Sequence, residues 1–130
     1  MIALDTNVLV RAFAADDQRQ GPPAQRLLQT LTDERPGFVN MTVMVELYWV
    51  LRRVLRVDEE RVHAIVDHML RTSAFEIEDG ESVGEALDHA RRGADFADAL
   101  IDATSRLCGV TETVTFDRDA ARRFGWRLLG

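Results

Sequence analysis

Short apolar runs of strand character alternate with helical segments along the whole of this 130-residue chain. The pattern begins at Ile2–Leu4, where a brief apolar run that ends at a polar residue is typical of a buried strand. After Asp58, which we expect to cap a helix, apolar residues recur at helical spacing as far as Leu70. Alternation of this kind predicts an α/β fold with a small, mainly parallel sheet flanked by helices.

The expected elements follow one another without a linker, an internal repeat or a low-complexity segment. Strands are expected at residues 2–4, 38–39, 75–77, 113–116 and 126–128. Helices are expected after Asp5, after Pro22, from Asn40 or Thr42 to about Arg56, after Asp58, and over residues 81–92, 95–108 and 117–124. We therefore expect one domain over residues 1–130. Parallel sheets place their sites beyond the carboxyl ends of the strands, so candidate residues are sought there.

The composition removes several kinds of chemistry. All 16 basic residues are Arg, which excludes a P-loop lysine and a Schiff-base lysine. The single Cys excludes an internal disulfide and a Cys-rich zinc site. The net charge of −6 gives no general attraction for nucleic acid, so such binding needs local Arg side chains or metal ions. We see no signal peptide and no membrane-spanning stretch, and we expect a soluble cytoplasmic protein.

Two acidic residues follow predicted strands directly. Asp5 ends the first strand in LDTN, and Asp117 ends the fourth in TVTFDRD. Asp is also a favoured residue at the start of a helix, so capping explains either residue when it is taken alone.

Two further acids lie within predicted helices. Glu46 occurs in TVMVELYWVL, where an ionised side chain among apolar residues is costly unless it is paired or binds a cation. We favour a role of Glu46 in a functional site over a salt bridge with Arg53.

Asp98 shares a predicted helix face with Asp95 and Asp102. We expect Asp102 to pair with Arg106, and for Asp95 capping and a place in the site remain equally open.

Convergence of Asp5, Glu46, Asp98 and Asp117 would need charge compensation. Two carboxylates 4 Å apart repel by about 4 kcal/mol at an effective dielectric constant near 20. Protons or divalent cations must offset that repulsion, and hard cations such as Mg²⁺ and Mn²⁺ prefer oxygen ligands. Metal ions held by carboxylates are a common apparatus for phosphodiester hydrolysis.

Four blocks of the sequence resemble the PIN-domain family, particularly VapC-like toxins of toxin–antitoxin pairs. The blocks are LDTNVLVR, VMVELYWVLRR, DFADALI and TVTFDRDA, and their acids are 41, 52 and 19 residues apart. The resemblance extends over essentially the whole chain and implies a single PIN-like domain. It also implies a Mg²⁺- or Mn²⁺-dependent endoribonuclease that forms a homodimer and is blocked by a protein antitoxin.

The resemblance also implies roles for individual residues. Asp5, Glu46, Asp98 and Asp117 would hold the metal and carry catalysis. Thr6, Asn7 and Thr115 would lie in or near the site and orient a carboxylate or a water, whereas Asp95 and Asp119 are adjacent acids without an assigned role. Because the chain has no Lys, any basic side chain that contacts RNA phosphates must be an Arg. The candidates are Arg11, Arg52, Arg53 and Arg56.

Other functions compete with this interpretation. A phosphatase with an aspartyl nucleophile would need a second Asp two residues after Asp5, where Asn7 stands. A non-catalytic PIN-like interaction module and a PIN-like nuclease acting on another nucleic acid both remain open. Metal titration separates an active nuclease from an inactive module.

Overall fold

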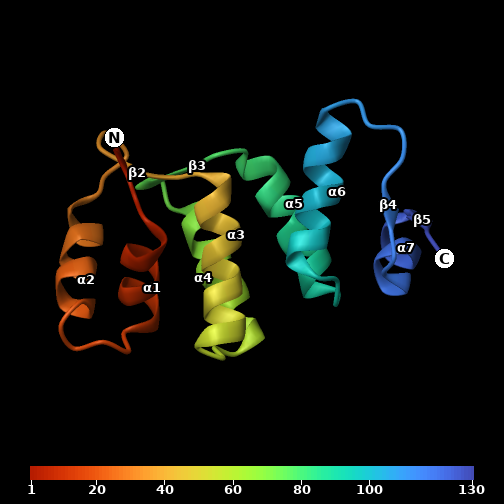
Figure 1. Ribbon diagram of the computed structural model, residues 1–130. Helices are drawn as coiled ribbons and strands as arrows, with labels where there is room; N and C mark the ends of the chain where they lie inside the picture. The colour runs from red at the N-terminus through yellow and green to blue at the C-terminus, as the bar shows by residue number, and fades with distance from the viewer. The chain divides into compact units, whose positions relative to one another are not determined.

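The computed structural model describes residues 1–130 (Figure 1). It consists of two compact units, Met1–Gly80 and Glu81–Gly130, and each is described by itself. That one domain spans residues 1–130 stays a prediction. None of the helices combines the length and the apolar character needed to cross a membrane.

The first unit contains a three-stranded sheet and the helices around it. Its elements are β1 (Ile2–Ala3), α1 (Thr6–Ala14), α2 (Gly21–Thr30), β2 (Gly37–Val39), α3 (Met41–Trp49), the π-helical segment η1 (Val50–Val54), α4 (Glu59–Arg71) and β3 (Phe75–Ile77).

The strands pair in the order β1-β2-β3, and both pairings are parallel. Ile2 lies opposite Gly37, and Gly37 lies opposite Phe75. Because parallel strands end at the same edge of a sheet, the residues that follow them gather there: Asp5, Asn40 and Glu78. The predicted α/β class and the parallel sheet are confirmed.

Polar side chains begin two of the helices at this edge. The side chain of Asp5 accepts a hydrogen bond from the backbone nitrogen of Thr6 at 2.8 Å, at the start of α1. Asn40 accepts one from the nitrogen of Val43 at 2.8 Å, at the start of α3. Asp58 occupies the N-cap position of α4, as predicted. Its side chain forms no capping hydrogen bond, so the prediction that it caps this helix is wrong.

The predicted helix from residue 40 to about residue 56 is divided in the structure. α3 ends at Trp49, and η1 continues it with wider turns, as in the 2.9 Å bond from the nitrogen of Leu55 to the oxygen of Val50. Arg56 has a φ of 54°, a left-handed backbone conformation that ends the segment. Apolar spacing does not separate α-helical from π-helical turns, so the sequence did not predict this change.

The core of the first unit lies between the sheet and its helices. Leu9 and Val10 of α1, together with Met44 and Leu47 of α3, are almost fully buried. Most of the predicted apolar face of α4 is also buried: Val62, Ile65, Val66 and Met69 lie in the core, whereas Leu70 is half-buried. The spacing therefore identified a face that packs in the core.

The second unit is mainly helical. Its elements are α5 (Gly80–Arg91, whose first residue belongs to the first unit), α6 (Phe96–Leu107), β4 (Val114–Thr115), α7 (Arg118–Phe124) and β5 (Arg127–Leu128). β4 and β5 pair in parallel, with Val114 opposite Arg127. Val83, Leu87, Phe96 and Leu100 are among the residues that form its core.

We predict opposite effects of alanine at two glycines. In β2, a Cβ on Gly37 would lie 2.5 Å from Cδ1 and 3.1 Å from Cγ of the buried Leu4. Gly37→Ala should therefore lower the free energy of unfolding by about 1–3 kcal/mol. In α5, a Cβ on Gly84 would meet nothing within 4 Å, and Gly84→Ala should raise that free energy by about 0.5–1 kcal/mol. Urea unfolding measures both changes, and equal stability of the two variants would contradict this packing.

Candidate carboxylate site

In the first unit, Thr6 and Glu46 form a direct contact. The hydroxyl of Thr6, at the start of α1, donates a short hydrogen bond to Oε1 of Glu46 on α3. Thr6 is only 4% exposed, so its hydroxyl has little access to water and is held toward this carboxylate. Two of the predicted site residues, 40 positions apart in sequence, are thus brought together.

Glu46 does not have the surroundings that its sequence neighbours indicated. It is exposed, whereas Val43, Met44 and Leu47 of the same helix turn into the core. The expectation of a costly charge among apolar residues is therefore wrong, because residues adjacent in a helix point in different directions. The partner of Glu46 is the hydroxyl of Thr6, and no ion pair joins it to Arg53.

Asp5 caps α1 through one carboxylate oxygen. Oδ1 accepts from the nitrogen of Thr6, while Oδ2 has no hydrogen-bond partner. Asn7 follows Thr6 and is exposed. A capping Asp therefore keeps an oxygen available for a cation, and the structural and functional roles of Asp5 are compatible.

In the second unit, acidic side chains gather around Asp98. Partial burial raises the pKa of the Asp98 carboxyl above its ordinary value of 3.8. The negative charges of Asp95, Asp117 and Asp119 raise this pKa further, in that order of importance. Asp98 and Asp117, both predicted from the sequence, are therefore close enough to repel each other.

Asp95 and Asp117 each hold the start of a helix. Asp95 caps α6 by accepting from the nitrogen of Asp98 at 2.9 Å. Asp117 caps α7 by accepting from the nitrogen of Ala120 at 3.0 Å, and its own nitrogen donates to the Thr115 hydroxyl at 3.0 Å.

Asp119 and Asp102 are held by arginines. Asp119 pairs with Arg123 at 2.7 Å and also with Arg122; these contacts hold the pKa of its carboxyl below the ordinary value. Asp102 pairs with Arg106 at 3.1 Å, as predicted, and also accepts from the indole nitrogen of Trp126 at 2.9 Å.

The four predicted ligands are all carboxylates, and carboxylate oxygens are ligands that hard cations such as Mg²⁺ and Mn²⁺ prefer. Asp5 and Glu46 lie in the first unit, and Asp98 and Asp117 lie in the second. No group of three or more His, Cys, Asp or Glu side chains in this structure is arranged to hold a metal ion. Metal binding by the four acids therefore stays a prediction.

Sequence reasoning missed Glu78. This residue follows β3, and its Oε1 accepts from the nitrogen of Met41 at 2.7 Å, at the start of α3. Glu78 thereby fixes the helix that carries Glu46. Its place directly after a predicted strand, like that of Asp5, was the signal that could have identified it.

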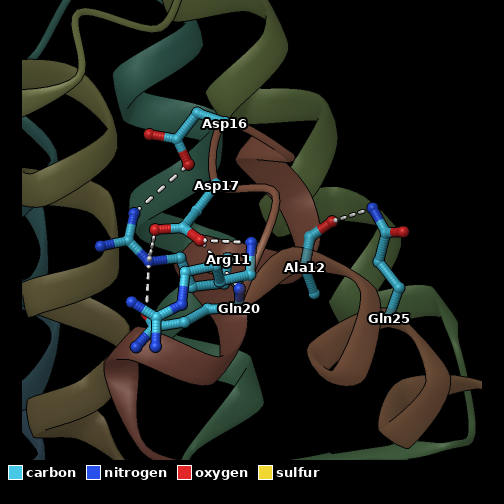
Figure 2. Close-up of polar contacts among 7 residues, drawn as sticks. Arg11, Ala12, Asp16, Asp17, Gln20 and Gln25 are labelled. Carbon is cyan, nitrogen blue, oxygen red and sulfur yellow. Dashed lines mark hydrogen bonds and ion pairs between the residues drawn. The ribbon is translucent and has the colours of Figure 1, made fainter.

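The arginines proposed for RNA binding differ in their surroundings. Arg11 donates to Gln20 at 2.8 Å and pairs with Asp16 at 3.3 Å (Figure 2). Arg52 is held by the oxygen of Val57 at 2.9 Å and by Glu59 at 3.7 Å. Arg53 and Arg56 are exposed and have no ionic partner in their unit. Contacts of all four with RNA stay a prediction.

Comparisons with known proteins agree with the sequence motifs. A family model for the PIN domain matches residues 2–125. A protein of Aquifex aeolicus (strain VF5) named VapC ribonuclease is 24% identical over 119 residues, which cover 91% of this chain and 88% of that protein.

The raised pKa of Asp98 predicts a pH-dependent gain in stability on Asp98→Asn. At neutral pH the ionised carboxylate is less favourable in the folded chain than in the unfolded chain, so in EDTA the variant should melt about 1–2 °C higher. The gain should shrink as the pH falls through the raised pKa and be absent well below 3.8, where Asp98 is protonated in both states. Calorimetry across this pH range measures it. A gain that is independent of pH, or a loss at neutral pH, would contradict the crowding of charges around Asp98.

Proposed function

Because this chain belongs to the PIN domain family, we propose that it is a metal-dependent endoribonuclease and the toxin of a toxin–antitoxin pair. The crowding of acids around Asp98 is the observation that carries the metal dependence, since such a group favours a bound cation. The name of the Aquifex aeolicus relative supports RNA as the substrate class.

Asp5, Glu46, Asp98 and Asp117 hold Mg²⁺ or Mn²⁺ in this proposal. When bound, the metal supplies an activated water and stabilises the leaving oxygen of the phosphodiester. Thr6 keeps one oxygen of Glu46 in a fixed direction through its hydroxyl. Asp95 and Thr115 hold the backbone at Asp98 and Asp117, so these two carboxylates start from ordered helix ends.

The remaining parts of the proposal concern the substrate and partners. The carboxamide of Asn7 has no hydrogen-bond partner and is available to orient water or substrate, and exposed arginines bind phosphates of the RNA. We further propose a homodimer in the cytoplasm that a protein antitoxin inhibits.

We predict that Asp98→Asn lowers metal-dependent RNA cleavage by at least about 100-fold, because it removes the charge of one of the four proposed metal ligands. Asp102→Asn is the matched control: it makes the same chemical change on the same helix, where the carboxylate is engaged by Arg106 and Trp126. The control should retain activity within about threefold once its fold is verified. The assay is cleavage of total cellular RNA in Mg²⁺, Mn²⁺ or EDTA.

The same assay distinguishes the competing functions. Equal loss in the two variants would move Asp102 into the site. Cleavage of DNA but not RNA would favour a nuclease for another nucleic acid. Intact folding without cleavage or metal binding would favour an interaction module.

Thr6 should act as a positioning residue for Glu46. Thr6→Val removes the hydroxyl with little change of shape, and we expect kcat to fall by about 10–100-fold with a smaller change in KM. Thr6→Ser keeps the hydroxyl and should restore most of kcat. Steady-state cleavage kinetics measure both variants; equally low kcat in Thr6→Ser would show that the methyl group, rather than the hydrogen bond, is what matters.

A further inference from the structure

A cavity of about 360 Å³ in the first unit is not used by the proposed metal site. It lies between α1 and α2, and we call it the α1–α2 cavity. Its apolar lining comes from Val8, Pro23, Ala24 and Leu27. Pockets for small ligands commonly measure about 300–1,000 Å³, so this one suits a single small group.

The rest of the lining is polar or positively charged. It consists of Asn7, Arg11, Arg19 and Gln20, and it contains no acidic residue. Arg11 is fixed by Asp16, Asp17 and Gln20, which Figure 2 shows around its guanidinium group.

Arg19 differs from Arg11 in having no partner for its charge. Its backbone nitrogen donates to Asp17 at 2.8 Å, but its exposed guanidinium group forms no ion pair or hydrogen bond. A fixed turn thus presents a guanidinium group without an ion-pair partner at a partly apolar cavity. This combination suits a ligand with an apolar face and a negative charge.

One residue of the cavity lining is adjacent in sequence to the proposed active site. Asn7, which lines the cavity, directly follows Thr6, the hydrogen-bond donor to Glu46. The cavity therefore begins one residue along α1 from the contact between Thr6 and Glu46.

We propose that the α1–α2 cavity binds one unpaired nucleotide of the RNA substrate. The inference rests on the proposed function and deepens it. The face of the base packs on the apolar lining, Asn7 and Gln20 offer amide groups to the base edge, and Arg19 binds a phosphate. An apolar side chain of a protein would fill the lining equally well, but it would leave the charge of Arg19 unmatched.

The test is binding of a short, fluorescein-labelled single-stranded RNA of mixed sequence to the full chain, followed by anisotropy in EDTA. Without metal the RNA stays intact, so the result is independent of cleavage. Arg19→Ala should weaken the Kd by about tenfold. Arg26→Ala is the matched control, because Arg26 is also exposed and without an ionic partner but does not line the cavity. It should change the Kd by less than about twofold.

A second variant fills the cavity. Leu27→Trp places a larger side chain at a half-buried lining position and should weaken RNA binding at least as much as Arg19→Ala does. Circular dichroism verifies that this variant is folded, and Arg19→Ala tests the proposal even if it is not.

The outcomes separate this inference from the proposed function. RNA affinity that is unchanged in Arg19→Ala, or reduced equally by Arg26→Ala, overturns the nucleotide site and favours a protein segment as occupant. RNA binding that depends on Arg19, in a protein that cleaves no RNA in Mg²⁺ or Mn²⁺, supports the cavity while contradicting the endoribonuclease.

Discussion

Parallel pairing of β1, β2 and β3 is the constraint from which the candidate site of the first unit follows. It brings Asp5, Asn40 and Glu78 to one edge of the sheet, where each contacts the start of a helix. The contact from Glu78 to the nitrogen of Met41 fixes α3, and α3 presents Glu46 to the hydroxyl of Thr6. Short strands thus position a hydrogen bond between residues far apart in sequence.

Capping and metal binding are complementary roles for the acids of this protein. Asp5, Asp95 and Asp117 each use one oxygen to cap a helix, which holds the carboxylate in place. The partial positive charge of a helix N-terminus also favours a nearby anion and offsets part of the repulsion among the acids. At Asp98, partial burial and the neighbouring negative charges raise the pKa of the carboxyl above its ordinary value.

Local patterns in the sequence predicted the features that depend on local chemistry. The α/β alternation, the buried face of α4 and the pairing of Asp102 with Arg106 all follow from residue spacing. Residue spacing could not predict three other features: the exposure of Glu46, the π-helical turns of η1 and the contact by which Glu78 fixes α3. They depend on which face of a helix meets the core and on contacts between distant segments, which spacing along the chain does not determine.

We propose that Asp5, Glu46, Asp98 and Asp117 bind the same metal centre. Titration of the metal-free protein with Mn²⁺, followed by electron paramagnetic resonance, tests it directly in wild type, Glu46→Gln and Asp98→Asn. Wild type should bind Mn²⁺, and each substitution should weaken that binding by at least about tenfold. Binding that is lost in only one of the two variants, or in neither, would contradict a shared centre.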